Sequence, residues 1–126
     1  MRLTDVVLAE NALADPQGRL SLYNLITAGL TVPSFPAVLR HLAVVTRWES
    51  PMPFRQRVAL FAPDGTLLAD ADAEAPAGPY LQLTLFSDVA LPVPGTYRLV
   101  IYAGGEEART VPLEVMQAQE PPGGET

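Results

Sequence analysis

The chain has 126 residues, 48% of them hydrophobic and 17% charged, which fits one domain with a sizeable core and argues against disorder. Its net charge of −6 argues against nonspecific binding of a nucleic-acid backbone, which needs clustered basic residues. The lack of cysteine excludes disulfides, thiolate metal sites and cysteine nucleophiles, and no apolar run approaches the about 20 residues that span a bilayer.

Alternating apolar and polar residues predict strands along most of the chain. Thirteen prolines and nine glycines separate the short apolar runs, which favours turns between strands over helices. We predict eight strands, at residues 3–12, 19–27, 38–49, 54–62, 67–74, 80–87, 96–103 and 107–115. Strands at this spacing are typical of an antiparallel β-sandwich or a small barrel.

The two ends of the chain differ in character. The N-terminal residues MRLTDVVLAENALAD include Asp5 and Glu10, which interrupt the apolar region that a signal peptide needs, so we predict a first strand and a cytoplasmic protein. The C-terminal residues MQAQEPPGGET do not alternate. We therefore predict one domain over residues 1–115 and a flexible tail over residues 116–126.

The alternation also divides each strand into two faces. One buried and one solvated face is typical of antiparallel sheets that cover each other, so the apolar sets predict the core. These sets are Leu42, Val44 and Trp48; Val58 and Leu60; Leu81, Leu83 and Leu85; Tyr97, Leu99 and Ile101; and Val111, Leu113 and Val115. Pro112 cannot donate to a strand ladder, which predicts an edge or a bulge there.

The segment FRQRVALFAPDGTLLADADAE, residues 54–74, is predicted to form a hairpin with opposed charges. With a tight turn at Pro63, the pairs are Phe61–Leu68, Leu60–Ala69, Ala59–Asp70, Val58–Ala71, Arg57–Asp72 and Arg55–Glu74. A slip by one residue would put Asp70 opposite Val58 in the core, which desolvation opposes. The alternative is a calcium site at the strand edge, although Gly65 precedes the acidic run and does not fit an EF-hand loop.

A second hairpin is predicted between residues 38–49 and 54–62. It places Leu42 opposite Leu60, Val44 opposite Val58, and Arg47 opposite Arg55. Arg47, Arg55 and Arg57 together could receive an anion or a partner's carboxylate. The alternative is a solvated charged face that nearby glutamates neutralise.

The sequence offers no set of residues for catalysis. Its single histidine, His41, lies on a polar strand face, and no G-x-S-x-G motif accompanies the serines. One histidine cannot form a multi-histidine metal site, and Schiff-base chemistry is impossible without lysine. We expect no catalytic residue, no metal and no cofactor.

Two connections are unusually apolar, over residues 28–36 and 48–54. Phe35, Trp48 and Met52 there are candidates for contact with a protein partner or with a second copy of the chain. The alternative is that Phe35 and Met52 close the ends of the core.

Several stretches resemble a known family. GRLSLYNLITAGLTVPSFPAVLRHLAVVTRWE (18–49), FAPDGTLL and LPVPGTYRLVIYAGGEEARTVPLEV resemble small bacterial proteins of unknown function that are believed to be immunoglobulin-like β-sandwiches. The Phe-Pro at 35–36 and the PG-x-Y at 94–97 are the most specific parts. The resemblance implies an all-β, single-domain, antiparallel immunoglobulin-like sandwich of about 7–8 strands, and no catalytic residue.

These observations favour a non-catalytic intracellular module that binds a protein partner or itself as a homodimer. We expect no nucleic-acid partner and no membrane partner. The alternative is a β-sandwich that binds a carbohydrate or a small anion.

Overall fold

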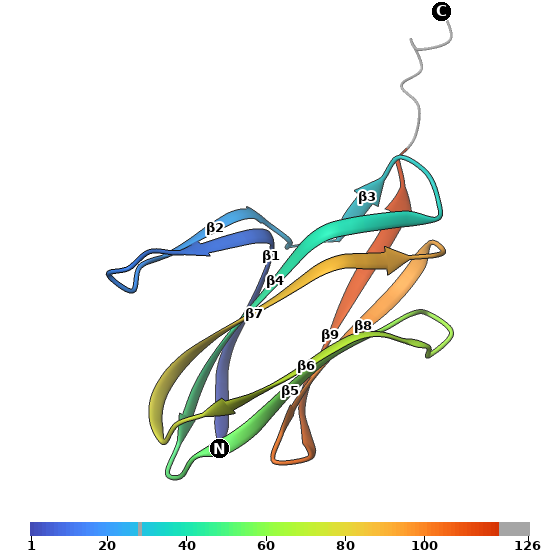
Figure 1. Ribbon diagram of the computed structural model, residues 1–126. Coiled ribbons are helices and arrows are strands. Elements are labelled where there is room, and N and C mark those ends of the chain that lie inside the picture. The colour runs from blue at the N-terminus through green and yellow to red at the C-terminus, as the bar shows by residue number, and fades with distance from the viewer. Residues whose placement is uncertain (28, 119–126) are drawn as a thin grey trace, which may run out of the picture.

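The computed structural model describes residues 1–27 and 29–118, which form two β-sheets facing each other across one core (Figure 1). In the described residues there is no helix. The nine strands are β1 (Arg2–Ala14), β2 (Leu20–Leu25), β3 (Leu30–Val32), β4 (Ala37–Ser50), β5 (Phe54–Phe61), β6 (Leu67–Ala75), β7 (Gly78–Leu91), β8 (Gly95–Ala103) and β9 (Glu106–Gln117). The all-β prediction is confirmed.

One sheet has four strands in the order β2-β1-β4-β7, and the other has five in the order β3-β9-β8-β5-β6. All neighbours are antiparallel except β3 and β9, which are parallel. Each predicted strand corresponds to an observed one, but eight was one too few because β3 was missed.

Strand β3 lies inside the segment predicted to be a connection. It has three residues and pairs with the end of β9, with Leu30 opposite Val115. Gly29 permits this approach, since a Cβ there would lie 2.6 Å from the Glu114 carbonyl oxygen and the residue has a φ of +140°. A strand of three residues is too short to show an alternating pattern, and it forms only because β9, far away in the chain, pairs with it.

The predicted hairpin between residues 38–49 and 54–62 is wrong. Strand β4 pairs with β1 and β7, whereas β5 pairs with β6 and β8. The connection between β4 and β5 therefore crosses from one sheet to the other. Leu42 and Leu60 do meet in one core cluster, but from opposite sheets. Alternation predicts which face a strand buries, but not which strand lies beside it.

The core contains a polar element at its centre. The ring of Trp48 packs edge-on against Phe54, with centroids 4.8 Å apart. The indole Nε1 of Trp48 and the hydroxyl of Thr46 both donate to Gln56 Oε1, at 2.7 and 2.5 Å. Gln56 is only 1% exposed, and these bonds from the facing sheet offset the loss of water around its carbonyl.

The PG-x-Y sequence forms the start of β8. Tyr97 is fully buried, and its hydroxyl donates to the Val93 carbonyl at 2.6 Å. This bond ties the connection that precedes β8 to the core. Farther along, Pro112 lies on the part of β9 that has only β8 as a ladder partner among the described residues, as predicted for an edge position.

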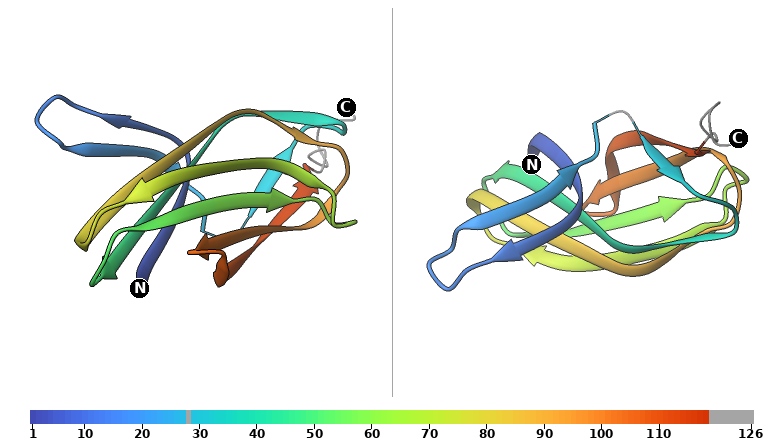
Figure 2. Two further views of the ribbon diagram at one scale, coloured as in Figure 1. Left: turned by 60° about the horizontal axis from the view of Figure 1, so that its bottom comes forward. Right: turned by 90° about the horizontal axis from the view of Figure 1, so that it is seen from above.

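The hairpin of β1 and β2 projects from the body of the molecule (Figures 1 and 2). Strand β1 pairs with β4 as far as Ala9, and from there onward it pairs with β2. At the other end of the chain, β9 continues to Gln117, so the tail predicted from residue 116 begins too early. The rest of that predicted tail, residues 119–126, lies outside the described residues.

Residues 1–27 and 29–118 contain no helix with the length and apolarity that crossing a bilayer requires.

Candidate functional site

The hairpin of β5 and β6, which carries the acidic residues, has the predicted register except at its turn. Val58 lies opposite Ala71 and Leu60 opposite Ala69 on the inner face, while Arg55 lies opposite Glu74 on the outer face. Arg55 bonds Glu74 at 3.0 Å. One pair differs at the turn, because a bulge after Leu60 places Phe61 opposite Leu67 instead of Leu68.

Arg57 lies opposite Asp72, as predicted, but its Nε bonds Asp70 diagonally at 3.1 Å. Its guanidinium carbon also lies 5.2 Å from the centre of the Tyr102 ring, and that of Arg98 lies 5.3 Å from the centre of the Phe61 ring. Ion pairs and stacked arginines therefore cover the outer face of the five-stranded sheet.

The three arginines predicted as an anion or partner contact are not brought together. Arg47 lies on the outer face of the four-stranded sheet, opposite Asp5 in the ladder. Arg55 and Arg57 lie on the outer face of the other sheet. Contrary to the prediction, Arg47 and Arg55 are not opposite each other, because β4 and β5 lie in different sheets.

The three apolar candidates also separate. Trp48 is 1% exposed and belongs to the core, so its side chain is not available on the surface. Phe35 is half-buried and packs against the core, as the alternative reading predicted. Met52 is 61% exposed, so it does not close the core.

No group of three or more histidine, aspartate or glutamate side chains is placed to hold a metal ion within residues 1–27 and 29–118. In the turn between β5 and β6, Asp64 instead accepts a hydrogen bond from the backbone N–H of Thr66 at 2.9 Å. That bond holds the pKa of Asp64 below its ordinary value.

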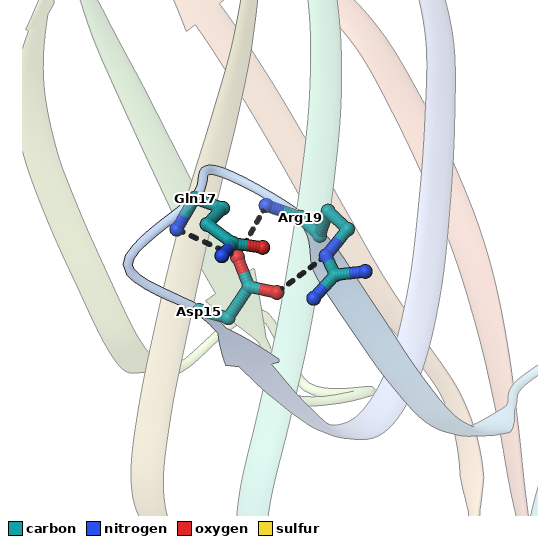
Figure 3. A network of polar contacts seen from close by, with 3 residues as sticks. All are labelled: Asp15, Gln17 and Arg19. Carbon is teal, nitrogen blue, oxygen red and sulfur yellow. Dashed lines mark hydrogen bonds and ion pairs between the residues drawn. The ribbon is translucent and has the colours of Figure 1, made fainter.

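A similar turn closes the projecting hairpin (Figure 3). Asp15 Oδ1 accepts the backbone N–H groups of Gln17 and Arg19, at 2.9 and 2.8 Å, and Oδ2 accepts the Arg19 Nε at 2.7 Å. The bonds from Arg19, the backbone one first, lower the pKa of Asp15. Both oxygens of this carboxylate accept hydrogen bonds within the turn, so we do not treat Asp15 as a binding site.

Strand β7 has its apolar face turned outward, contrary to the prediction. Leu81 is 46% exposed and Leu85 is 44% exposed, and Leu83 is half-buried on the same face. The inner face carries Tyr80, Gln82, Thr84 and Phe86. The ladder with β4 explains this, because Trp48 lies opposite Tyr80 and Leu42 opposite Phe86, and these side chains pack in the core. Two aromatic rings occupy the interior in place of three leucines.

The outward leucines continue an apolar surface over the four-stranded sheet. One row crosses all four strands, and the next row crosses β1, β4 and β7. The first consists of Leu25, Ala9, Ala43 and Leu85, and the second of Val7, Val45 and Leu83. The bent hairpin covers part of this surface, since Ala12, Leu20 and Leu22 pack with Ala9 and Ala43. Leu83 packs against the same cluster, whereas Leu81 and Leu85 stay exposed.

The free edge of β7 is the feature that makes its outward leucines a candidate site. Among the described residues, β7 has a ladder partner only on the side of β4. No charged residue occurs from Gly78 to Ser87. Edge strands in soluble proteins are usually protected by charge, proline or a bulge, because their unpaired backbone groups pair readily with another chain. We call Leu81, Leu83, Leu85 and the adjoining free edge of β7 the leucine edge.

Two other strands at sheet edges, β6 and β2, carry such protection away from their ends. Three carboxylates project from β6, those of Asp70, Asp72 and Glu74. In β2, Asn24 has a φ of +55°, which interrupts the regular strand. The sequence did contain a signal for the reversed β7, since Tyr80 and Phe86 share a face with Gln82 and Thr84. The three leucines outweighed it in the prediction.

The fold and this surface define a two-sheet all-β protein with an apolar edge strand that carries no charged residue from Gly78 to Ser87. The chain belongs to the family described as "Family of unknown function (DUF6941)", whose model matches residues 4–116. Among curated proteins, none matches the chain.

Proposed function

We propose that this protein is a non-catalytic, cytoplasmic protein-binding or scaffold module that binds its partner through the leucine edge. The observation that carries the proposal is the reversed polarity of β7, whose outer face holds Leu81, Leu83 and Leu85. An extended segment of a partner can add to a free edge by backbone hydrogen bonds, while side-chain contacts on the sheet face supply selectivity.

The energetics favour this surface over the charged one. Burying two leucine side chains that are nearly half exposed removes apolar area from water, which is worth about 25 cal/mol per Å². The outer ion pairs, by contrast, already bond one another, and exposed pairs contribute only about 0–1 kcal/mol each. Leu81 and Leu85 are therefore the contact residues of the proposal.

We infer further that the fold is immunoglobulin-like. Such sandwiches place the first, second and fifth strands in one sheet and the third, sixth and seventh in the other. Without β2 and β3, the strands β1, β4 and β7 correspond to the first set, and β5, β8 and β9 to the second, with β6 added beside β5. Tyr97, whose hydroxyl bonds the backbone four residues upstream, matches the tyrosine corner of these folds. A fold alone does not assign a function, so the proposal depends on the surface.

The test is an affinity capture from native lysate with three baits. They are the natural chain, the Leu81→Glu/Leu85→Glu variant, and a Leu13→Glu/Leu67→Glu control. The control changes two leucines that are 60% and 45% exposed on β1 and β6, away from the leucine edge. We expect a protein that the natural chain and the control retain and the β7 variant loses. Capture of the same proteins by all three baits would reject the leucine edge as the binding surface.

A further inference from the structure

The stretch of β7 from Gly78 to Asp88 has its three leucines placed symmetrically about Leu83. It is bounded by two residues of positive φ, Gly78 at +92° and Asp88 at +51°. Leu83 lies midway between them, and Leu81 and Leu85 lie two residues to either side. A strand with this symmetry can pair with an antiparallel copy of itself so that the start of the stretch in one copy lies opposite its end in the other copy.

One antiparallel register uses this symmetry fully. When Leu83 lies opposite its own copy, Leu81 lies opposite Leu85 and Gly78 opposite Asp88. No other antiparallel register places all three leucines of each copy opposite leucines. Residues directly opposite in such a pair have Cβ atoms about 4.5–5.5 Å apart on the same face, so the leucines would make a continuous apolar strip across both copies.

The inner face of β7 gives a second, independent reason for the same register. The side-chain carbonyl oxygen of Gln82, Oε1, is buried and has no hydrogen-bond partner within residues 1–27 and 29–118, although its amide nitrogen donates to the Leu83 carbonyl at 3.3 Å. In the register described, Gln82 lies opposite Thr84 of the second copy. A threonine hydroxyl can donate to that oxygen, which removes the cost of leaving it unpaired.

The same pairing places Tyr80 opposite Phe86, and cross-strand aromatic pairs stabilise sheets. It meets no charge repulsion within the ladder, because no acidic or basic side chain occurs from Gly78 to Ser87. The edge strand β6 lacks this property, since two copies would oppose rows of carboxylates.

We propose that the partner at the leucine edge is a second copy of this chain, joined by antiparallel pairing of β7 with β7 about a two-fold axis at Leu83. The two four-stranded sheets then form one continuous sheet. This inference depends on the proposed function, because it names the occupant of the same surface, but the two can fail separately.

The experiment is sedimentation equilibrium of the full chain over a range of concentrations, with the variants Leu81→Glu/Leu85→Glu and Leu81→Lys/Leu85→Glu. In the proposed register, residue 81 of one copy meets residue 85 of the other. The first variant therefore opposes like charges and should weaken self-association by about 100-fold or more. The second opposes unlike charges and should associate again at low salt, with the association lost at high salt.

Two controls make the result specific. Leu13→Glu/Leu67→Glu should dimerise like the natural chain, and circular dichroism should show the same β content for every variant. A natural chain that stays monomeric at high concentration, a dimeric Leu81→Glu/Leu85→Glu variant, or a Leu81→Lys/Leu85→Glu variant that stays monomeric at low salt would overturn the pairing. If the chain is monomeric while a captured partner still depends on Leu81 and Leu85, the proposed function stands and the self-pairing falls.

Discussion

Strands β6 and β7 follow each other in the chain, and each lies at the free side of its sheet, yet they present opposite chemistry to water. The inner face of β6 is built from alanines, and its outer face carries Asp70, Asp72 and Glu74. The inner face of β7 holds two aromatic and two polar residues, and its outer face carries three leucines. Charge thus protects the edge of β6 along its length, whereas β7 has protective features only near its ends, at Pro79 and Asp88.

A neighbouring strand can decide which face of an alternating strand is buried, as it does for β7 but not for β6. Both strands alternate, but in β6 the charges cannot enter the core, so the pattern alone sets its orientation. In β7 either face can be buried, and the rings of Tyr80 and Phe86, which pack with Trp48 and Leu42, select the side that carries Gln82.

The largest expected effect is on the free energy of unfolding, and it distinguishes the inner face of β7 from the outer face. Phe86→Ala should lower the free energy of unfolding by about 3–5 kcal/mol, because it removes a ring that is 7% exposed from the core. Leu85→Ala should change it by only about 0.5 kcal/mol, since the side chain is 44% exposed. Urea denaturation at low protein concentration measures both. Equal losses would mean that the leucines face inward.

The inner face of β6 should accept only small side chains. Ala75 is 1% exposed in the same core cluster as Phe86, so Ala75→Leu should lower stability by about 1–3 kcal/mol through overpacking. Ala77, exposed in the connection that follows, provides the matched control, because Ala77→Leu should leave thermal unfolding almost unchanged. A tolerated Ala75→Leu would show unused space beside β7.

The charges on β6 should contribute little to stability. Arg55 and Glu74 form an exposed pair, so the coupling in a double-mutant cycle with Arg55→Gln and Glu74→Gln should be about 0.2–1 kcal/mol. It should vanish in about 1 M salt, where charges are screened within about 3 Å. A coupling that survives high salt would mean that the pair is held more tightly than its exposure implies.

The smallest expected effect is the titration of the Asp64 carboxylate at acidic pH. The pKa of Asp64 is lower in the folded chain than in the unfolded chain, so its contribution is present above the unfolded pKa and is lost as the pH falls through the folded pKa. The Thr66 amide resonance should shift in that acidic range and stop shifting in an Asp64→Asn variant. Amides of residues 80–85 should not follow this titration, because that stretch of β7 has no carboxylate. A shift there with the midpoint of Asp64 would contradict the separation of the two strands.

Much of the fold could be predicted where interactions are local. Alternation in residues 38–49 assigned Leu42, Val44 and Trp48 to the core, and they lie there. The register of β5 and β6 followed from a short turn and from the cost of burying Asp70, and the ladder has that register apart from the last pair at the turn. The candidate site was harder, because its three leucines had been assigned to the core.

What the sequence determined by itself was the all-β class, the strand positions and the sides of most strands, since period-two alternation and carboxylate desolvation act along one strand or one hairpin. Only the tertiary structure decided that β4 and β5 lie in different sheets, that β3 joins β9, and that β7 turns its leucines outward. Each of these depends on contacts between residues far apart in the chain. There, two arrangements satisfy the same local pattern, and packing around Trp48 and Phe86 distinguishes them for β7.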